Sequence, residues 1–297
     1  MSARIVHAPM PQSPVVGDCL QVGGIALTEL AARVGRTPFY AYDRAVMSRN
    51  VERLRAHLPR QVHLHYAVKA NPMPDVVRHF AERIDGLDVA SAGELRVALA
   101  SGMSPAEISF AGPGKTDADL EQALAARIVV NLESEREMER LAALAVKSGV
   151  KARVAVRVNP DFELKSSGMR MGGGPKQFGV DAERVPALLA RIGAAAMDFK
   201  GFHIFSGSQN LRADAISEAQ EKSIELALRL AAHAPAPVRM LNIGGGFGIP
   251  YFPGEQPFDI AAVGRRLGEL LEDVPKRLTQ ARQGIELGPI LVGASGL

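Results

Sequence analysis

The sequence has 297 residues, 47% of them apolar and 23% charged, and this composition is typical of a soluble globular protein with one large domain or two small ones. The 35 Lys and Arg residues against 32 Asp and Glu form no basic block, and aromatic residues make up only 5%, so no nucleic-acid partner is predicted. The single cysteine, Cys19, excludes an internal disulfide and a Cys-rich zinc site. No apolar stretch is long enough for a membrane helix and Met1–Pro14 has no apolar leader, so a cytoplasmic protein without a membrane segment is predicted.

The first part of the chain is predicted to be accessory to the main fold. Met1–Arg36 has the composition of a loop, with two short strand patterns at Cys19–Val22 and Ile25–Leu27. A helix is predicted over Asp43–Leu58, because its apolar residues recur on one face, Asp43 can cap its start and a proline follows its end.

From residue 62 onward, short β-branched runs alternate with longer amphipathic stretches. The predicted strands are Val62–Val68, Leu87–Ala90, Ile108–Ala111, Ile128–Asn131, Arg153–Val158, Gly201–Phe205, Met240–Ile243 and Ile285–Leu287. The predicted helices between them are Pro74–Ile84, Gly93–Ala100, Thr116–Ala126, Glu133–Ser148, Ala182–Ala194, Ala213–Ala232 and Ile260–Ala281. This alternation predicts a parallel sheet, and the strand count favours an α/β fold of the (β/α)8 barrel type over an open doubly wound sheet, since no G-x-G-x-x-G follows the first strand. No helix is predicted after the last strand, so Asp43–Leu58 is expected to fill that place in the outer ring.

One predicted connection is unusually long. Residues 159–179 contain five glycines together with Lys165, Arg170 and Lys176. Long connections in compact domains are usually functional or disordered, so this segment is either a mobile surface loop or a lid over the site. The three cations favour contact with an anionic substrate group if the segment is a lid, and are solvated otherwise.

Polar residues follow the predicted strands at the end where barrel sites form. In chain order they are Lys69, Asp88 with Ser91, Gly112, Asn131, Arg157 with Asn159, Ser206 with Ser208, Gly244–Gly246, and Glu286. A lysine, a glycine turn whose N–H groups can approach a phosphate, and a carboxylate for a pyridinium nitrogen are what a protein contributes to pyridoxal phosphate chemistry. Each signal alone has a structural explanation: a solvated strand end for Lys69, a tight turn for the glycines, and an Arg partner for Glu286 or Asp88.

Two histidines, His63 and His65, share one face of the first predicted strand. They could be two ligands of a metal, but no third ligand is evident. Packed or hydrogen-bonded histidines explain them as well, and no metal is predicted.

Six sequence blocks, in order and each at a strand end, resemble the fold type III pyridoxal-phosphate decarboxylases, the ornithine, diaminopimelate and arginine decarboxylases with an alanine-racemase-like barrel. The blocks are HYAVKANP (65–72), LDVASAGEL (87–95), RVNP (157–160), GFHIFSGSQ (201–209), NIGGGFGIPY (242–251) and ELG (286–288). The stretch 162–181 is similar to the exosortase-associated and siderophore-type branch.

The resemblance implies a role for each matching residue. Lys69 would form the Schiff base with pyridoxal 5'-phosphate, Asp88 and Glu94 would lie near it, and Arg157 would support the acid that faces the ring. Ser208 and Gly244, Gly245 and Gly246 would hold the phosphate, and Glu286 would contact the pyridine nitrogen. Two positions depart from the family pattern: Phe205 stands where a stacking histidine is usual, and Pro289 replaces a phosphate-binding arginine.

The resemblance also implies a division of the chain. Residues 1–36 would belong to an accessory β-domain, 37–288 to the cofactor-binding barrel, and 289–297 to a stub of a C-terminal β-domain that is missing, so that the chain is expected to be truncated. In the family that domain supplies a Cys and a Tyr across a homodimer, and a homodimer is expected for the full-length form.

The function predicted is decarboxylation of an amino acid, a diamino acid or a related substrate, with pyridoxal phosphate on Lys69. The alternatives are a non-catalytic barrel that binds pyridoxal phosphate for cofactor homeostasis, or an inactive truncated decarboxylase. A racemase on the same barrel needs a Tyr base from the missing domain and has no support in the sequence.

Overall fold

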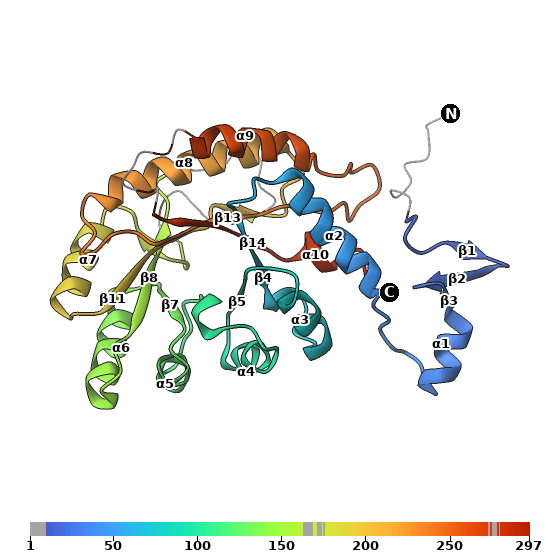
Figure 1. The fold of residues 1–297 in the computed structure, drawn as a ribbon, viewed down its shortest axis with the longest axis horizontal. Coiled ribbons are helices and arrows are strands. Elements are labelled where there is room, and N and C mark those ends of the chain that lie inside the picture. Colours follow the sequence, from blue (N-terminus) through green and yellow to red (C-terminus); the bar gives the residue numbers. More distant parts are fainter. Residues whose placement is uncertain are drawn as a thin grey trace.

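The computed structural model describes residues 10–162, 169–170, 174, 176–272, 274, 278 and 280–297, and at its centre eight parallel strands close into a barrel (Figure 1). The strands are β4 (His63–Ala67), β5 (Gly86–Val89), β6 (Ile108–Phe110), β7 (Val129–Leu132), β8 (Arg153–Asn159), β11 (Asp198–Ile204), β13 (Met240–Gly245) and β14 (Arg282–Leu287). Each strand pairs with the next in this order, and β14 pairs back with β4. The predicted (β/α)8 barrel is confirmed.

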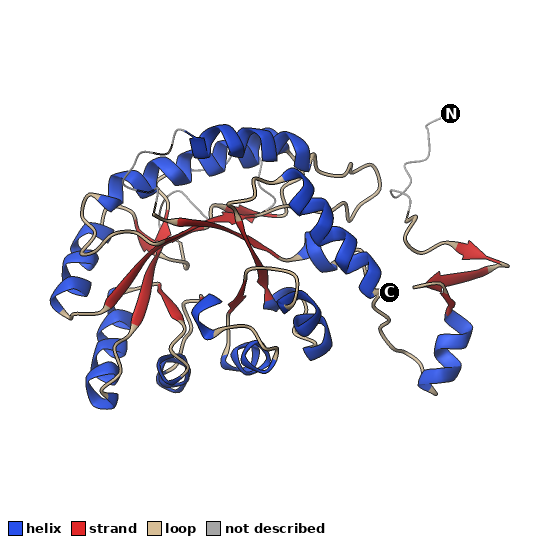
Figure 2. Ribbon diagram, in the orientation of Figure 1, coloured by secondary structure: helices blue, strands red, loops and turns tan. Residues whose placement is uncertain are grey.

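Helices surround the barrel in a ring (Figures 1 and 2). They are α2 (Arg44–His57), α3 (Pro74–Ala81), α4 (Ala92–Ala100), α5 (Asp117–Ala125), α6 (Glu135–Ser148), α7 (Val185–Ala194), α8 (Ala213–Ala231) and α9 (Ile260–Glu272), with 3-10 turns η1 (Val68–Ala70) and η2 (Pro105–Glu107). The side chain of Asp43 caps α2 by accepting from the N–H of Ala45 at 2.7 Å. Because α2 packs against α9 and against α10 (Pro289–Val292), it fills the predicted gap in the ring.

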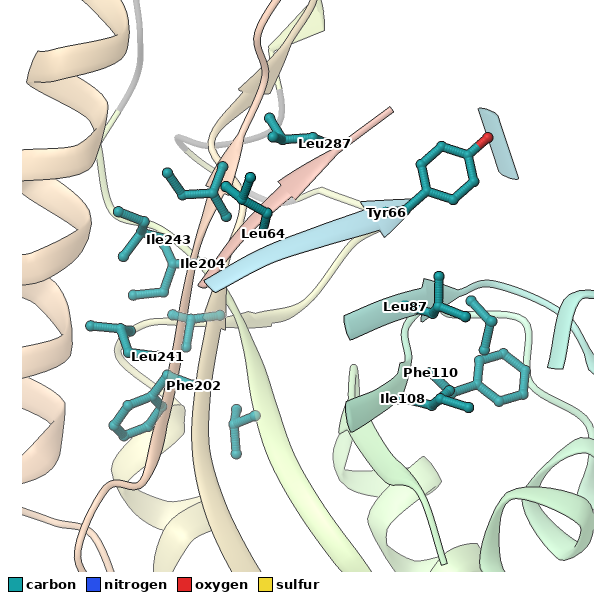
Figure 3. Close-up of a cluster of buried hydrophobic side chains, with 14 of the residues drawn as sticks. Leu64, Tyr66, Leu87, Ile108, Phe110, Phe202, Ile204, Leu241, Ile243 and Leu287 are labelled. Atoms are coloured by element: carbon teal, nitrogen blue, oxygen red, sulfur yellow. The ribbon is translucent and has the colours of Figure 1, made fainter. Parts of the chain in front are cut away.

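The barrel strands separate apolar from polar side chains by their alternation. One set, which includes Leu64, Leu87, Phe202 and Leu241, is buried in the core cluster with the helix residues (Figure 3). The other set is buried as well but polar: His65, Asp88, Ser109, Asn131, Arg157, His203, Asn242 and Glu286. Barrel interiors are usually filled by branched apolar residues. Here the apolar core lies between the barrel and the helix ring, and the inside of the barrel is polar.

Several predicted boundaries differ from the structure: α3 ends at Ala81 and not Ile84, α9 spans Ile260–Glu272 and not Ile260–Ala281, and β14 begins at Arg282 and not Ile285. Three further differences have a local cause. The pattern at Ile25–Leu27 is a strand only over β3 (Ile25–Ala26), because helix α1 (Leu27–Val34) begins at Leu27 and ends at Gly35, whose φ of 74° stops it. Helix α6 begins two residues later than predicted, since Ser134 is its N-cap and accepts from the N–H of Glu137 at 3.1 Å. The third, β11, begins at Asp198 and carries a bulge after Phe199 that hides its alternation.

The expectation that no helix follows the last strand is wrong. The short helix α10 starts at Pro289, which suits a first helical position because its missing N–H would be unpaired there. Beyond it, Gly296 forms an antiparallel bridge with Tyr42, and Leu297 exchanges two backbone hydrogen bonds with Ala41 at 2.9 and 3.0 Å. The segment 289–297 therefore packs onto the start of α2.

The N-terminal residues form a small antiparallel sheet of β1 (Val15–Val16), β2 (Cys19–Val22) and β3, followed by α1. Figure 1 shows it beside the barrel rather than in it. In the long connection, β9 (Met169–Arg170) pairs with β12 (Gly207–Ser208) and β10 (Val180–Asp181) extends the edge of β8. Lys165 and three of the loop glycines lie outside the described residues, so the lid stays a prediction.

Two glycines in α9 provide a test of how the ring closes on α2. An alanine Cβ at Gly264 would overlap the carbonyl oxygen of His57 and lie 2.8 Å from its carbonyl carbon, whereas at Gly268 the nearest atom is Pro59 Cγ at 3.8 Å. We expect Gly264→Ala to lower the free energy of unfolding by about 1–3 kcal/mol, as overpacking does. Gly268→Ala, the matched control, should raise it by up to about 1 kcal/mol through helix propensity. Urea denaturation measures both, and equal effects would show that α9 does not need this close contact.

Candidate functional site

A cavity of about 350 Å³ opens at the carboxyl ends of the barrel strands. Its lining residues are Ala67, Lys69, Ala70, Phe178, Phe205, Ser208, Gly246, Phe247, Glu286, Gly288 and Pro289. This face is where barrel enzymes form their sites. Five of the predicted site residues, from four different connections or strands, therefore meet around one cavity: Lys69, Phe205, Ser208, Gly246 and Glu286.

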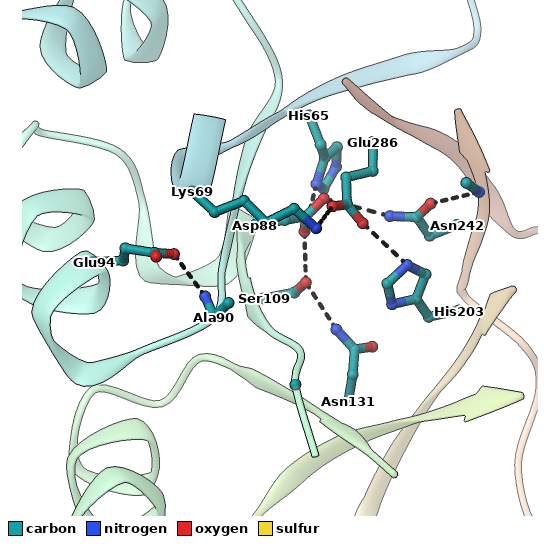
Figure 4. A network of polar contacts seen from close by, with 12 residues as sticks. His65, Lys69, Asp88, Ala90, Glu94, Ser109, Asn131, His203, Asn242 and Glu286 are labelled. Carbon is teal, nitrogen blue, oxygen red and sulfur yellow. Dashed lines mark hydrogen bonds and ion pairs between the residues drawn. The ribbon is translucent and has the colours of Figure 1, made fainter. Parts of the chain in front are cut away.

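An ion pair lies at the centre of this site. Lys69, on η1 directly after β4, donates from Nζ to Oε1 of Glu286 on β14 at 3.0 Å (Figure 4). His203 Nε2, on β11, lies 3.2 Å from the other carboxylate oxygen. The lysine side chain is 59% exposed and the Glu286 side chain only 6%, so the amine can be reached from outside while the carboxylate is held in the barrel.

The charges in this group shift each other's protonation. Burial alone would raise the pKa of Glu286, but Lys69, His203 and Arg157 outweigh it and hold that pKa well below its usual range. The Glu286 carboxylate in turn raises the pKa of Lys69, against the opposing effect of its partial burial. The site at neutral pH therefore presents a fixed carboxylate beside an ammonium.

The glycine turn at the end of β13, Gly244–Gly246, brings backbone close to the cavity. Gly244 and Gly246 have φ of 73° and 69°, which favours glycine at both positions. A Cβ at Gly245 would overlap the carbonyl oxygen of Glu286, and one at Gly246 would overlap that of Gly207. The side chain of Asn242 holds the turn, because its Oδ1 accepts from the N–H of Gly244 at 2.9 Å. Only glycines fit here, and the turn is of the kind that cradles a phosphate.

Phe205 supplies an aromatic face to the same cavity. Its ring centre lies 5.8 Å from Lys69 Nζ and 6.4 Å from the ring of His203, which it meets edge to face. An amine, a buried carboxylate, an aromatic face and a glycine turn together fit the aldehyde, the ring nitrogen, the ring and the phosphate of pyridoxal phosphate. The residues present are therefore compatible with the predicted cofactor.

Asp88 organises a second polar group inside the barrel. It accepts from Ser109 Oγ at 2.6 Å and from Asn242 Nδ2 at 3.4 Å, and lies 3.3 Å from His65 Nδ1 (Figure 4). Burial lowers the pKa of His65, but Asp88, with smaller contributions from Glu107 and Asp85, outweighs burial and the net shift is upward. His65 is thus a hydrogen-bonded histidine, which was the alternative to a metal ligand in the sequence analysis. The Asp88 charge also helps to raise the pKa of Lys69, so the structure brings it near the lysine, as predicted.

Arg157 has a partner that sequence reasoning missed. Its guanidinium donates to Glu133 Oε1 at 3.0 Å and lies 4.8 Å from the ring centre of Phe178. Glu133 also accepts from the N–H groups of Gly112 and Gly179. Arg157 was expected to support Glu286; it helps to lower the pKa of Glu286, but its ion pair is with Glu133. The position of Glu133 directly after β7 was a signal that it belongs to the site end of the barrel, although its pairing with Arg157 could not be read from the sequence.

Glu94, expected near the cofactor ring, has a local role in the structure. Its carboxylate accepts from the N–H of Ala90 at 2.8 Å, and its own N–H donates to Ser91 Oγ at 3.2 Å. These are the contacts of a capped helix start, here that of α4. Figure 4 places its carboxylate away from Glu286, so a contact with a bound ligand stays a prediction.

The fold and the site are those of a (β/α)8 barrel protein that binds pyridoxal phosphate. Residues 44–293 match the family model described as pyridoxal-dependent decarboxylase, pyridoxal binding domain. The chain belongs to this family of pyridoxal-phosphate decarboxylases.

Individual relatives agree with this assignment. The chain is 33% identical over 274 residues to the L-glutamyl-[BtrI acyl-carrier protein] decarboxylase of Niallia circulans, a match that covers 91% of this chain and 64% of that protein. It is 35% identical over 286 residues to the diaminopimelate decarboxylase of Aquifex aeolicus, covering 94% and 65%. The chain thus spans less than two thirds of either relative.

Solved structures support the fold as well. The diaminopimelate decarboxylase of M. jannaschii in complex with L-lysine superposes with a TM-score of 0.85 at 26% identity, covering 96% of this chain and 68% of that one. The Helicobacter pylori diaminopimelate decarboxylase with L-lysine gives a TM-score of 0.80 at 27% identity, covering 91% and 68%. Within the described residues, no helix has the length and apolarity to cross a membrane.

The ion pair makes a prediction that needs no cofactor. Because the Glu286 carboxylate raises the pKa of Lys69, Glu286→Gln should lower it and leave more of the amine unprotonated at a given alkaline pH. Competitive acetylation followed by mass spectrometry should then give faster labelling of Lys69. Glu139→Gln, which removes an exposed carboxylate paired with Arg191, is the control of equal charge. An unchanged pH profile for Lys69 in Glu286→Gln would contradict the assignment.

Proposed function

We propose that this chain is the cofactor-binding part of a decarboxylase that removes the α-carboxylate of an amino acid, with pyridoxal phosphate attached to Lys69. The observation that carries the proposal is the Lys69–Glu286 pair in a cavity that also contains the glycine turn. Family membership supports it, because the matching model covers the barrel and the site.

The residues divide the work of holding the cofactor. Gly244–Gly246 and Ser208 would bind the phosphate, Phe205 would cover one face of the ring, and Glu286 would meet the ring nitrogen. When bound, pyridoxal phosphate supplies an electron-withdrawing ring that accepts the electron pair left by the departing CO2. A carboxylate with a depressed pKa stays ionised, so Glu286 can hold a proton on that nitrogen by hydrogen bonding to it.

Lys69 would carry a second task. Its side chain lines the cavity and is 59% exposed, and its raised pKa keeps the amine protonated, so it would have a proton to return to the substrate carbon that has lost CO2. Phe205 and Phe178 line the same cavity with apolar rings and would exclude water from that carbon. His203 and Arg157 would help to keep Glu286 ionised, because both lower its pKa.

The substrate, partners and setting are part of the proposal. A diamino acid or a related amino acid is the proposed substrate, since similar proteins are named for diaminopimelate and for a carrier-bound glutamyl group. We place the cofactor-binding domain at 37–288, with 1–36 and 289–297 belonging to a β-domain, and propose a cytoplasmic homodimer for the full-length protein. The second candidate is a barrel that binds the cofactor without decarboxylation; the specific observation in its favour is Pro289, which lines the cavity where the family has a phosphate-binding arginine.

Borohydride reduction in the presence of pyridoxal phosphate tests the attachment. We expect the reduced cofactor on Lys69, and none on Lys115, which is buried and donates to Gly112 O, Asn131 O and Glu137 at 2.6–2.9 Å. Peptide mass mapping locates the adduct, and Lys69→Arg is the control. An unmodified Lys69 peptide at saturating cofactor would contradict the proposal. Release of CO2 from a panel of diamino acids then separates the decarboxylase from the non-catalytic barrel.

The hold of Asn242 on the glycine turn gives a further prediction. Asn242→Ala leaves the N–H of Gly244 without its acceptor, and the loosened turn should weaken binding of pyridoxal phosphate by about tenfold, or about 1.4 kcal/mol. Absorbance titration measures the dissociation constant. The matched control is Asn50→Ala, which removes a side-chain hydrogen bond to Leu291 O, away from the turn. Equal affinities in both variants would mean that the turn holds its shape without Asn242.

A further inference from the structure

The opposite end of the barrel contains a second cavity, of about 160 Å³, which shares no lining residue with the cofactor cavity. Four cationic residues line it, one from the start of each of four consecutive strands: Arg153, Lys200, Arg239 and Arg282. His63 and His65 of β4 also line it. We call it the basal cavity.

Backbone pairing holds three of these cations at the same level. The N–H of Arg239 donates to the carbonyl of Lys200 at 2.8 Å, and the N–H of Arg282 donates to the carbonyl of Arg239 at 3.0 Å. His63 lies opposite Gly284 in the β4–β14 register, next along the same rim. The cations are therefore placed by the sheet itself and not by flexible loops.

The carboxylates nearby neutralise only part of this charge. Arg282 pairs with Glu107 at 2.8 Å and Lys200 pairs with Asp198 at 2.7 Å. Arg153 donates to a neutral acceptor, the carbonyl of Arg127, at 2.8 Å. Within the described part of the chain, the side chain of Arg239 has no hydrogen-bond or ion-pair partner. Arg153 and Arg239 thus line the cavity without a carboxylate partner, while the lining carboxylates Glu107 and Asp88 are paired with Arg282 and His65.

The floor of the basal cavity offers donors as well. His65 and Asn242 are buried and line it together with Asp88 and Ser109, whose hydroxyl is already donated to Asp88. Asp88 contacts Nδ1 of His65 and raises the pKa of this imidazole, and the protonated form of His65 would have a second N–H, at Nε2, for a ligand. A volume of about 160 Å³ is roughly that of five waters at ~30 Å³ each, enough for an ion of phosphate size.

We propose that the basal cavity is a second binding site, separate from the cofactor, for a phosphate-sized oxyanion held by Arg153 and Arg239. Guanidinium groups bind phosphate through paired N–H donors, and an arginine without a carboxylate partner keeps these donors available for an anion. Such a ligand is either free phosphate or the phosphate group of a small metabolite. The ligand would also reach Asn242, which lines the basal cavity and whose Oδ1 accepts from Gly244 in the glycine turn.

Titration with inorganic phosphate tests the proposal. Calorimetry on the full chain saturated with pyridoxal phosphate, which blocks the cofactor's own phosphate cradle, should show one site. Arg239→Gln and Arg153→Gln should each weaken it at least tenfold. Arg49→Gln, an exposed arginine of α2, is the control of equal charge and should leave it unchanged. Arg239→Gln removes no side-chain bond of the described structure, so the variant is expected to fold.

The outcomes are distinct. Saturable binding that is lost in both cavity variants and kept in Arg49→Gln supports the site. A parallel titration with glycerol 3-phosphate identifies the source of the group: tighter binding than phosphate indicates a phosphorylated metabolite, and equal binding indicates the free ion. No saturable phosphate binding, or equal binding by wild type and Arg239→Gln, overturns the proposal. If pyridoxal phosphate itself does not bind, the comparison of Arg239→Gln with Arg49→Gln still decides.

Discussion

The ion pair of Lys69 and Glu286 is the constraint on which the site depends, and it joins residues 217 positions apart in the chain. It forms only because the last barrel strand returns to pair with the first, which sets Glu286 opposite His65 in the register of β14 and β4. A buried carboxylate without a partner costs several kcal/mol, so the ammonium of Lys69 and the neighbouring His203 make its position tolerable. Closing the barrel and assembling the site are therefore one event.

The cofactor end and the basal end of the barrel are connected through side chains of the interior. Asp88 contacts Asn242, and Asn242 holds Gly244 in the turn beside the cofactor cavity. His65 reaches Asp88 from the basal side. The two cavities share no residue, yet a change in the hydrogen bonds of Asp88 touches both.

Much of the fold followed from the sequence because alternation and strand-end residues are local signals. Lys69, Glu286 and the glycine turn were predictable, since each lies at or near the carboxyl end of a strand and the barrel gathers such ends on one face. Side-chain pairings between neighbouring strands were not predictable from the sequence. The bond of Glu133 to Arg157 depends on the register of β7 against β8, and the sequence around Glu133 reads as the start of a helix. In the sequence, Glu94 fits both a helix cap and a site residue. Only the structure shows that its carboxylate accepts from the N–H of Ala90.

The polar interior has a consequence for how this protein can change. In one strand, Leu64 and Tyr66 are packed in the apolar core, while His63 and His65 line the basal cavity. Alternate residues of the same strand therefore serve the apolar core and the polar interior of the barrel. A substitution at an inward position acts on the polar network inside the barrel and only indirectly on the apolar packing between sheet and helices. Barrels of this design can exchange ligands over evolutionary time at either end while keeping one unchanged shell.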